Sequence, residues 1–274
     1  MGRIRKIRCQ LGGICFLLLV ASTLCTGCTA ARRAVRRSVP PVLPSAARLQ
    51  AALLARRDAL QSLRALARVR YRDPQESNTS REALVVARPD RIRVEVLSVF
   101  GSVFVLTTGN GVMAAYARRA NTVYRGRASP ENLERYARLG LPVHSLVDIV
   151  LATPPVHPDR PAEVSFDTAA GRIRLRQEFD EGVQLVWFSD ARLPVAAEER
   201  DPAGRAHWRA TFGDYENHRD VLVATRVGFE LPAWSQAVEM TLRDIDVNPS
   251  LDHSIFALQT PPDSKVVNLD RGSD

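Results

Sequence analysis

The strongest constraint on the fold is a pair of neighbouring segments, residues 91–97 and 103–108, that follow the geometry of β-strands. In the first segment the apolar residues Ile92, Val94 and Val96 alternate with charged residues, which is the period-two pattern of a strand with one buried face. The second segment is apolar on both faces. The connection between them is short, and short strands joined by tight turns indicate an antiparallel sheet.

The turn between these two strands carries bulky apolar side chains. Val99 and Phe100 stand beside Gly101, where turns normally present polar residues to water. Two interpretations are open. Either the pair folds back under its own turn as part of the core, or it faces something apolar outside the protein.

Similar short strands are predicted between residues 67 and 125 and again between residues 162 and 247. Gly109-Asn110-Gly111 is a strong hairpin signal within the first group. Because no internal repeat or interdomain linker is evident, we expect one α+β domain that is mainly antiparallel β. A strongly curled sheet, or unclosed β-barrel, of about ten or eleven strands with helices covering its concave side would bury these strands.

Three helices are predicted. The first begins at Ser45, and its apolar stripe consists of Leu49, Leu53, Leu60, Leu63 and Leu66. The second lies between Ser129, a helix-capping residue, and Gly140.

The third predicted helix, over residues 143–151, is short and amphipathic. His144 and Asp148 fall four positions apart on it, and we expect them to form a hydrogen-bonded pair on its surface. The tail from Asp263 is polar, and we expect it to be loosely ordered.

Residues 1–28 are interpreted as an export signal. A basic start is followed by an apolar run, Leu11–Leu24, that is short for a membrane span, and small residues precede Cys28. This ending resembles a bacterial lipobox, which predicts cleavage before Cys28 and attachment of lipid to Cys28. An ordinary secretory signal or an uncleaved anchor is the alternative. The predicted segments are a signal peptide (1–27), a lipidated Pro/Arg-rich tether (28–44), one folded domain (45–267) and a polar tail (268–274).

The cysteines and charges agree with this interpretation. The four cysteines are Cys9, Cys15, Cys25 and Cys28, so the folded domain has no disulfide, thiolate metal site or thiol nucleophile. Eight of the 38 Lys+Arg residues lie within residues 1–37, and the remaining 30 equal the 30 Asp+Glu residues. A neutral domain gives no electrostatic support for binding nucleic acid.

No pattern of residues supports catalysis or metal binding. His157, His207, His218 and His253 are scattered, and the chain contains no Gly-x-Ser-x-Gly elbow, His-Glu-x-x-His motif or phosphate-binding glycine loop. We therefore expect no enzyme activity, no catalytic residue, no bound metal and no cofactor.

Several short segments carry a family resemblance. They are Leu-Ser-Val-Phe-Gly-Ser at 97–102, Gly-Leu-Pro-Val-His-Ser-Leu at 140–146, His-Trp-Arg-Ala-Thr-Phe-Gly-Asp-Tyr at 207–215, Arg88-Pro89, and Ser254-Ile255-Phe256 followed by Thr260-Pro261-Pro262. Through their order and spacing, the chain resembles the LolA/LolB superfamily, and within it most of all the outer-membrane lipoprotein receptor LolB. These periplasmic proteins shield the acyl chains of lipoproteins and deliver them to the outer membrane. The resemblance extends from about Leu49 to Val267.

The resemblance implies an unclosed antiparallel barrel with a helical lid and an apolar cavity for acyl chains. It implies a membrane-inserting loop at Val99 and Phe100. The candidate cavity or lid positions are Arg88, Val94, Val96, Val105, Leu146 and Val150.

The function implied is that of a lipid-anchored outer-membrane lipoprotein that faces the periplasm, binds the acyl chains of lipoproteins and helps insert them into the outer membrane. Thr29, which follows Cys28, is not aspartate, and by the enterobacterial sorting rule this predicts the outer membrane. The implied partners are acylated lipoproteins or lipids, a periplasmic LolA-type carrier and the inner leaflet of the outer membrane. We expect a monomer and no nucleic-acid partner.

Two other functions remain open at this stage. One is a lipid- or glycolipid-binding, or envelope-sensing, lipoprotein on the same scaffold. The other is a structural envelope lipoprotein with a packed interior. Inward-facing apolar residues are compatible with a filled core as well as with a cavity, so the sequence does not separate these readings.

Overall fold

A computed structural model describes residues 42–137 and 139–270, which belong to a single compact unit. Cys28, the predicted signal peptide and nearly all of the predicted tether lie outside the described residues. The helices are α1 (Ala46–Ala59), α2 (Pro130–Ala137) and α3 (Val143–Val150), with short 3₁₀ turns η1 (Arg118–Ala120), η2 (Pro232–Trp234) and η3 (His253–Phe256). The strands are β1 (Ser62–Arg72), β2 (Ser77–Ala87), β3 (Arg91–Ser98), β4 (Gly101–Gly109), β5 (Val112–Ala117), β6 (Thr122–Arg127), β7 (Ala162–Asp167), β8 (Arg172–Phe179), β9 (Gly182–Phe188), β10 (Pro194–Arg200), β11 (Ala206–His218), β12 (Val221–Leu231), β13 (Gln236–Val247) and β14 (Lys265–Asn268).

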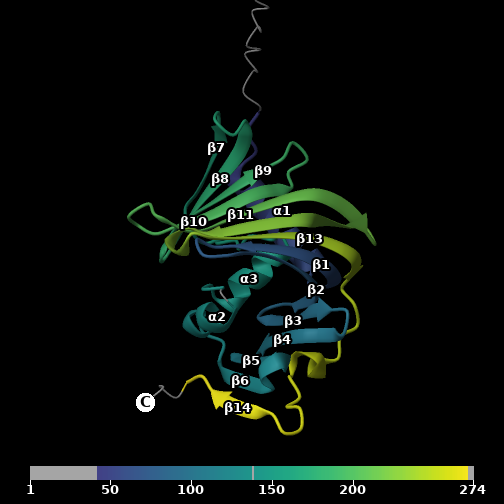
Figure 1. The fold of residues 1–274 in the computed structure, drawn as a ribbon. Coiled ribbons are helices and arrows are strands. Elements are labelled where there is room, and N and C mark those ends of the chain that lie inside the picture. The colour runs from purple at the N-terminus through teal and green to yellow at the C-terminus, as the bar shows by residue number, and fades with distance from the viewer. Residues whose placement is uncertain (1–41, 138, 271–274) are drawn as a thin grey trace, which may run out of the picture. The chain divides into compact units, whose positions relative to one another are not determined.

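These strands form one curled, unclosed sheet in the order β14-β6-β5-β4-β3-β2-β1-β13-β12-β11-β10-β9-β8-β7 (Figure 1). All neighbours along β6 to β7 pair antiparallel, as expected, and only β14 pairs parallel, with β6. Within the described residues the sheet has 14 strands, so the expectation of ten or eleven was too low. A sheet this wide stays compact only by curling strongly.

The C-terminal segment is ordered as far as it is described, through residue 270, contrary to the expectation of a loose tail from Asp263. Residues 265–268 form the edge strand β14, and Leu269 is buried beyond it. The Asp270 carboxylate accepts hydrogen bonds from the backbone N–H of Arg127 (2.9 Å) and the side chain of Asn132 (3.1 Å). This strand was missed because its order comes from pairing with β6, far away in the sequence, and not from local alternation.

The N-terminal helix starts where the sequence predicted and ends earlier. Ser45 caps α1 by accepting a hydrogen bond from the backbone N–H of Arg48 (3.3 Å), and α1 stops at Ala59. The predicted helical stripe through Leu63 and Leu66 is wrong because both residues belong to β1. Strand β1 pairs along its length with β2 on one edge and β13 on the other, and these strands hold its backbone N–H and C=O groups in the sheet.

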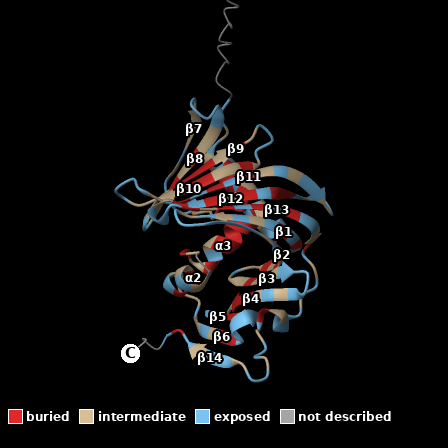
Figure 2. Ribbon diagram, viewed as in Figure 1, coloured by how far each residue is buried: buried red, intermediate tan, exposed pale blue. Residues whose placement is uncertain are grey.

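The helices pack on the concave face of the sheet, and α3 lies deepest in it (Figure 1). Six of the eight residues of α3 are buried, and Figure 2 shows this helix as the most completely buried one. The core continues from α3 to Leu49 and Leu53 of α1 and to inward residues of both halves of the sheet. In the described part of the chain, no helix has both the length and the apolar composition that crossing a bilayer requires.

Candidate functional site

An apolar row on β3 and β4 runs out from under α3. Ile92 stands beside Thr108, Val94 beside Leu106, and Val96 beside Phe104 on the concave face. At the α3 end Ile92 and Leu106 are only 7% and 5% exposed, whereas Val94, Val96 and Phe104 are half-buried. The row therefore passes from the closed core to a partly open apolar surface.

The structure brings together most of the predicted cavity and lid positions. Leu146 and Val150 are buried on α3 in the same core cluster as Leu106, and Val94 packs against that cluster. Val96 follows Val94 on the same face of β3. Val105 is separate: it is buried on the opposite face of β4, because side chains alternate across a strand.

Arg88, the remaining predicted position, ties α3 to the sheet. Its guanidinium contacts the carboxylate of Asp148 on α3 and the hydroxyl of Thr153, and its Nε donates to the carbonyl of Leu60 (3.2 Å). Both side chains of the ion pair are almost enclosed, with 7% and 5% exposed. Arg57 of α1 approaches Asp148 from the other side at 3.4 Å. Burial lowers the pKa of Arg88, and the Asp148 carboxylate opposes that shift.

The predicted surface pair of His144 and Asp148 does not form. Asp148 points into the protein toward Arg88, whereas His144 is exposed. A buried carboxylate requires a cationic partner, and Arg88 supplies it from the turn after β2, 60 residues away in the sequence. We call the Arg88–Asp148 pair the α3 latch.

The β3–β4 turn projects its apolar side chains into solvent. Val99 and Phe100 are 92% and 86% exposed, so they are not part of the core. The turn is held by the Ser98 hydroxyl, which donates to the carbonyl of Gly101 (2.8 Å), and by Arg118, which donates to the carbonyl of Phe100 (3.1 Å). The apolar tip is thus presented by a hydrogen-bonded turn.

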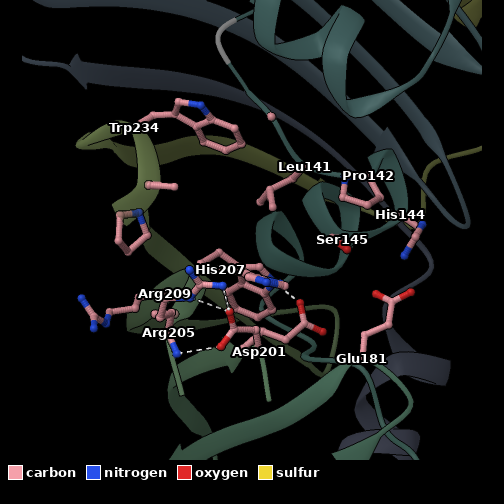
Figure 3. Close-up of a pocket in the computed structure, with 16 residues that line it drawn as sticks. Leu141, Pro142, His144, Ser145, Glu181, Asp201, Arg205, His207, Arg209 and Trp234 are labelled. Atoms are coloured by element: carbon pink, nitrogen blue, oxygen red, sulfur yellow. Dashed lines mark hydrogen bonds and ion pairs between the residues drawn. The ribbon is translucent and has the colours of Figure 1, made fainter. Parts of the chain in front are cut away.

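A separate open pocket of about 910 Å³ lies between the start of α3, the ends of β10 and β11, and η2. Figure 3 shows its side chains, with Trp234 on one wall and the residues of β11 opposite. Trp234 is 44% exposed, whereas Trp208 is buried and its indole N–H donates to the carboxylate of Glu199. The pocket thus combines an accessible aromatic ring with polar groups.

Most charges around this pocket are already compensated. Arg205 is paired with Asp201 at 2.8 Å, and Arg209 is paired with Glu198 at 3.2 Å. Burial raises the pKa of Glu199, and the hydrogen bond from Trp208 opposes this shift. The pocket therefore does not select strongly for a charged ligand.

Replacing Glu199 by glutamine is expected to stabilise the fold at neutral pH. The pKa of Glu199 is raised in the folded state, so the neutral carboxyl contributes fully to stability below the unfolded value of 4.5. This stability is lost as the pH rises through the folded value and the buried carboxyl ionises. The stability gained by Glu199→Gln should therefore shrink as the pH falls toward 4.5. Urea unfolding from neutral pH down to that point tests this, and a difference that does not vary with pH contradicts it.

Glu199 and Trp234 are the site residues that the sequence did not single out, and Asp148 was expected to pair with His144 instead of Arg88. No local signal marks Glu199 or the true partner of Asp148, because both contacts come from other elements. No periodicity marks Trp234 either, because it lies on a short 3₁₀ turn after a strand. In the described residues, no group of three or more His, Cys, Asp or Glu side chains is arranged to hold a metal ion.

Comparison with known proteins identifies the fold. No protein-family model and no curated protein matches the chain. A domain from Vibrio parahaemolyticus, assigned to outer-membrane lipoprotein sorting, aligns at 15% identity over 77% of this chain and 95% of its own, with a TM-score of 0.55. A DUF1329 family protein from Desulfovibrio piger aligns at 13% identity over 77% of this chain and 95% of its own, with a TM-score of 0.53. At these identities the matches show a shared fold, which is the curled, unclosed antiparallel sheet with a few helices.

Proposed function

We propose that this protein is an envelope lipoprotein that holds the acyl chains of lipoproteins on its concave face and delivers them to the outer membrane. The observation that carries the proposal is the apolar row that leads from the core under α3 through Val94, Val96 and Phe104, along the two strands whose connecting turn carries the exposed Val99 and Phe100. Such a row offers acyl chains a path along which they remain in contact with apolar surface. The shared fold with a lipoprotein-sorting domain supports the same assignment.

Transfer on this surface needs no chemical step. Each Å² of apolar surface removed from water contributes about 25 cal/mol, so an acyl chain moves to whichever surface buries more of it. The half-buried row binds part of a chain, and the bilayer next to the tip would bury all of it. We accordingly propose no catalytic residue and no cofactor, and a lipid anchor at Cys28 that keeps the protein at the outer membrane on its periplasmic side.

The α3 latch fits the role of a lid. Acyl chains reach the buried end of the row only if α3 moves, and the Arg88–Asp148 pair opposes that movement. The energy of binding a chain must then offset the opening of the latch. The partners proposed are acylated lipoproteins or lipids and a periplasmic carrier of the LolA type, which would hand over the cargo.

Replacing Val96 by glutamate is expected to weaken binding of a triacylated lipopeptide by roughly tenfold or more, because acyl chains would have to cover a charge. Val96 is half-buried at the open part of the row. Val112→Glu is the matched control, since Val112 is 49% exposed at the start of β5, beyond the far end of β4. Fluorescence titration with a labelled triacylated peptide measures the affinity of each variant, and equal affinities of the two variants would contradict the proposed site.

A second candidate is a lipid or glycolipid carrier on the same scaffold. The pocket beside Trp234 favours it, because an exposed aromatic ring among compensated charges suits a polar, uncharged headgroup. Native mass spectrometry separates the two proposals. A co-purified lipid supports the carrier, and reversible binding of triacylated peptide supports lipoprotein delivery.

A further inference from the structure

We propose that the β3–β4 tip docks specifically on anionic lipid, through arginines that flank its apolar side chains. The inference rests on the proposed function and adds the class of lipid that the tip recognises. The docking surface consists of the exposed apolar residues Leu97, Val99, Phe100 and Val103 together with Arg81, Arg118 and Arg119.

The arginines bracket the tip from both neighbouring strands. On one side, Arg81 of β2 is the cross-strand neighbour of Leu97, and both side chains are exposed. On the other side, Arg118 of η1 donates hydrogen bonds to the carbonyls of Phe100 (3.1 Å) and Ser102 (3.5 Å). Arg119 follows Arg118 on the same exposed 3₁₀ turn.

The positive charge of this surface is not cancelled by ion pairs. Across residues 42–137 and 139–270, Arg81, Arg118 and Arg119 take part in no ion pair. Glu95, which lies two residues before Leu97, is already paired with Arg93 at 2.6 Å. The surface therefore combines four exposed apolar side chains with three arginines whose charge is not neutralised by an ion pair.

The combination matches the interface of an anionic bilayer. A single apolar anchor gives marginal membrane binding, and stable docking takes a second signal such as a basic patch. Each arginine near an anionic surface contributes by attraction to the headgroups, and this attraction decays within the screening length of the solution. The apolar tip binds marginally by itself and has no preference for lipid charge, so the arginines are what makes docking depend on lipid charge.

The test uses the full chain with Phe100→Trp, which places a fluorophore at the tip; the unmodified chain, with Trp187, Trp208 and Trp234, supplies the baseline. Protein is added to vesicles of phosphatidylcholine, or of phosphatidylcholine with phosphatidylglycerol, that carry doxyl-labelled lipid as quencher. We expect quenching at the tip with the anionic vesicles, reversal of that quenching at high salt, and little quenching with phosphatidylcholine alone. The N-terminal segment, with its own arginines, is the same in every variant, so differences between variants in the same vesicles report the tip.

The paired substitution Arg81→Gln with Arg119→Gln should lower the ratio of docked to undocked tip roughly fivefold for each arginine lost, and so roughly 25-fold for both. Arg118 is left unchanged because it holds the turn. The matched control is Arg64→Gln with Arg172→Gln, which removes two exposed charges away from the tip.

Equal quenching in both kinds of vesicle overturns the inference, as does equal behaviour of the two paired variants or the absence of quenching in all vesicles. The proposed function is judged separately by binding of triacylated peptide in solution. A chain that binds the peptide and docks regardless of lipid charge loses only this inference. A chain that docks on anionic vesicles and binds no peptide loses only the proposed function.

Discussion

Replacing Arg88 by methionine is expected to lower the free energy of unfolding by about 3 kcal/mol, because Asp148 then stays buried without its close cationic partner. Both side chains of the latch are nearly enclosed. Arg57 remains 3.4 Å from Asp148, which keeps the loss near the lower end of the range for broken buried ion pairs. Urea unfolding, with the slope checked for a two-state transition, measures the change.

Two further variants show whether the loss comes from the unpaired charge. Arg88→Met combined with Asp148→Leu removes both charges and should recover most of the stability, to within about 1 kcal/mol of the parent. Arg205→Met breaks the pair between Asp201 and the exposed Arg205 and should change stability by less than about 0.5 kcal/mol. If Arg88→Met alone costs no more than the exposed control, Arg57 suffices to neutralise Asp148 and there is no α3 latch.

The second large effect is functional and leaves the fold intact. Phe100→Glu should change the free energy of unfolding by less than about 0.5 kcal/mol, because the Phe100 side chain is exposed and makes no core contact. Burying phenylalanine contributes roughly 1.5–3 kcal/mol, and a carboxylate at the same position resists entry into the bilayer. Delivery of triacylated lipoprotein to vesicles should therefore fall by at least about tenfold.

Delivery is measured as the transfer of a labelled triacylated lipoprotein from this protein to quencher-containing vesicles. Val112→Glu serves as the control, because it introduces the same charge at an exposed valine on a different hairpin. Both variants should retain cargo binding in solution. Unimpaired delivery by Phe100→Glu would exclude the tip from the transfer step, and loss of cargo binding would move its role from the membrane to the cargo.

These two experiments separate the two ends of the apolar row. In the proposed function the α3 latch controls access to the buried end, where Ile92 and Leu106 lie, and the tip acts at the open end. A variant that affects only one end changes either the binding of cargo or its delivery. If the protein were a passive structural element, neither substitution would change cargo binding or delivery beyond its effect on stability.

The sequence predicted the features that depend on neighbours along the chain. Alternation at Ile92, Val94 and Val96 reports the pleat of a strand, which has a period of two residues wherever the strand is placed. The Gly109–Gly111 hairpin and the cap at Ser45 follow from backbone conformations and hydrogen bonds within a few residues. The unusual apolar turn at Val99 and Phe100 was also readable, because it violates a local rule, but whether it folds back or faces outward was decided only by the structure.

Other features were settled only by contacts between distant segments. Residues 62–66 became the first part of a strand instead of the end of a helix because β2 and β13 pair with them from both sides. Val105 faces away from α3 although it is as apolar as Val94, since strand register alone decides the face. Strand β14 exists because β6 has a free edge beside it.

The α3 latch shows the same division most clearly. The sequence places Asp148 on a short amphipathic helix and Arg88 after a strand, and local rules assign the carboxylate to a surface pair with His144. In the folded chain the helix turns Asp148 inward, where desolvation makes a distant arginine the required partner. Local periodicity therefore determined most of the elements of this protein. The tertiary structure decided the remaining strands and which charges and apolar surfaces the elements share, because burial is a property of the whole assembly and not of any segment.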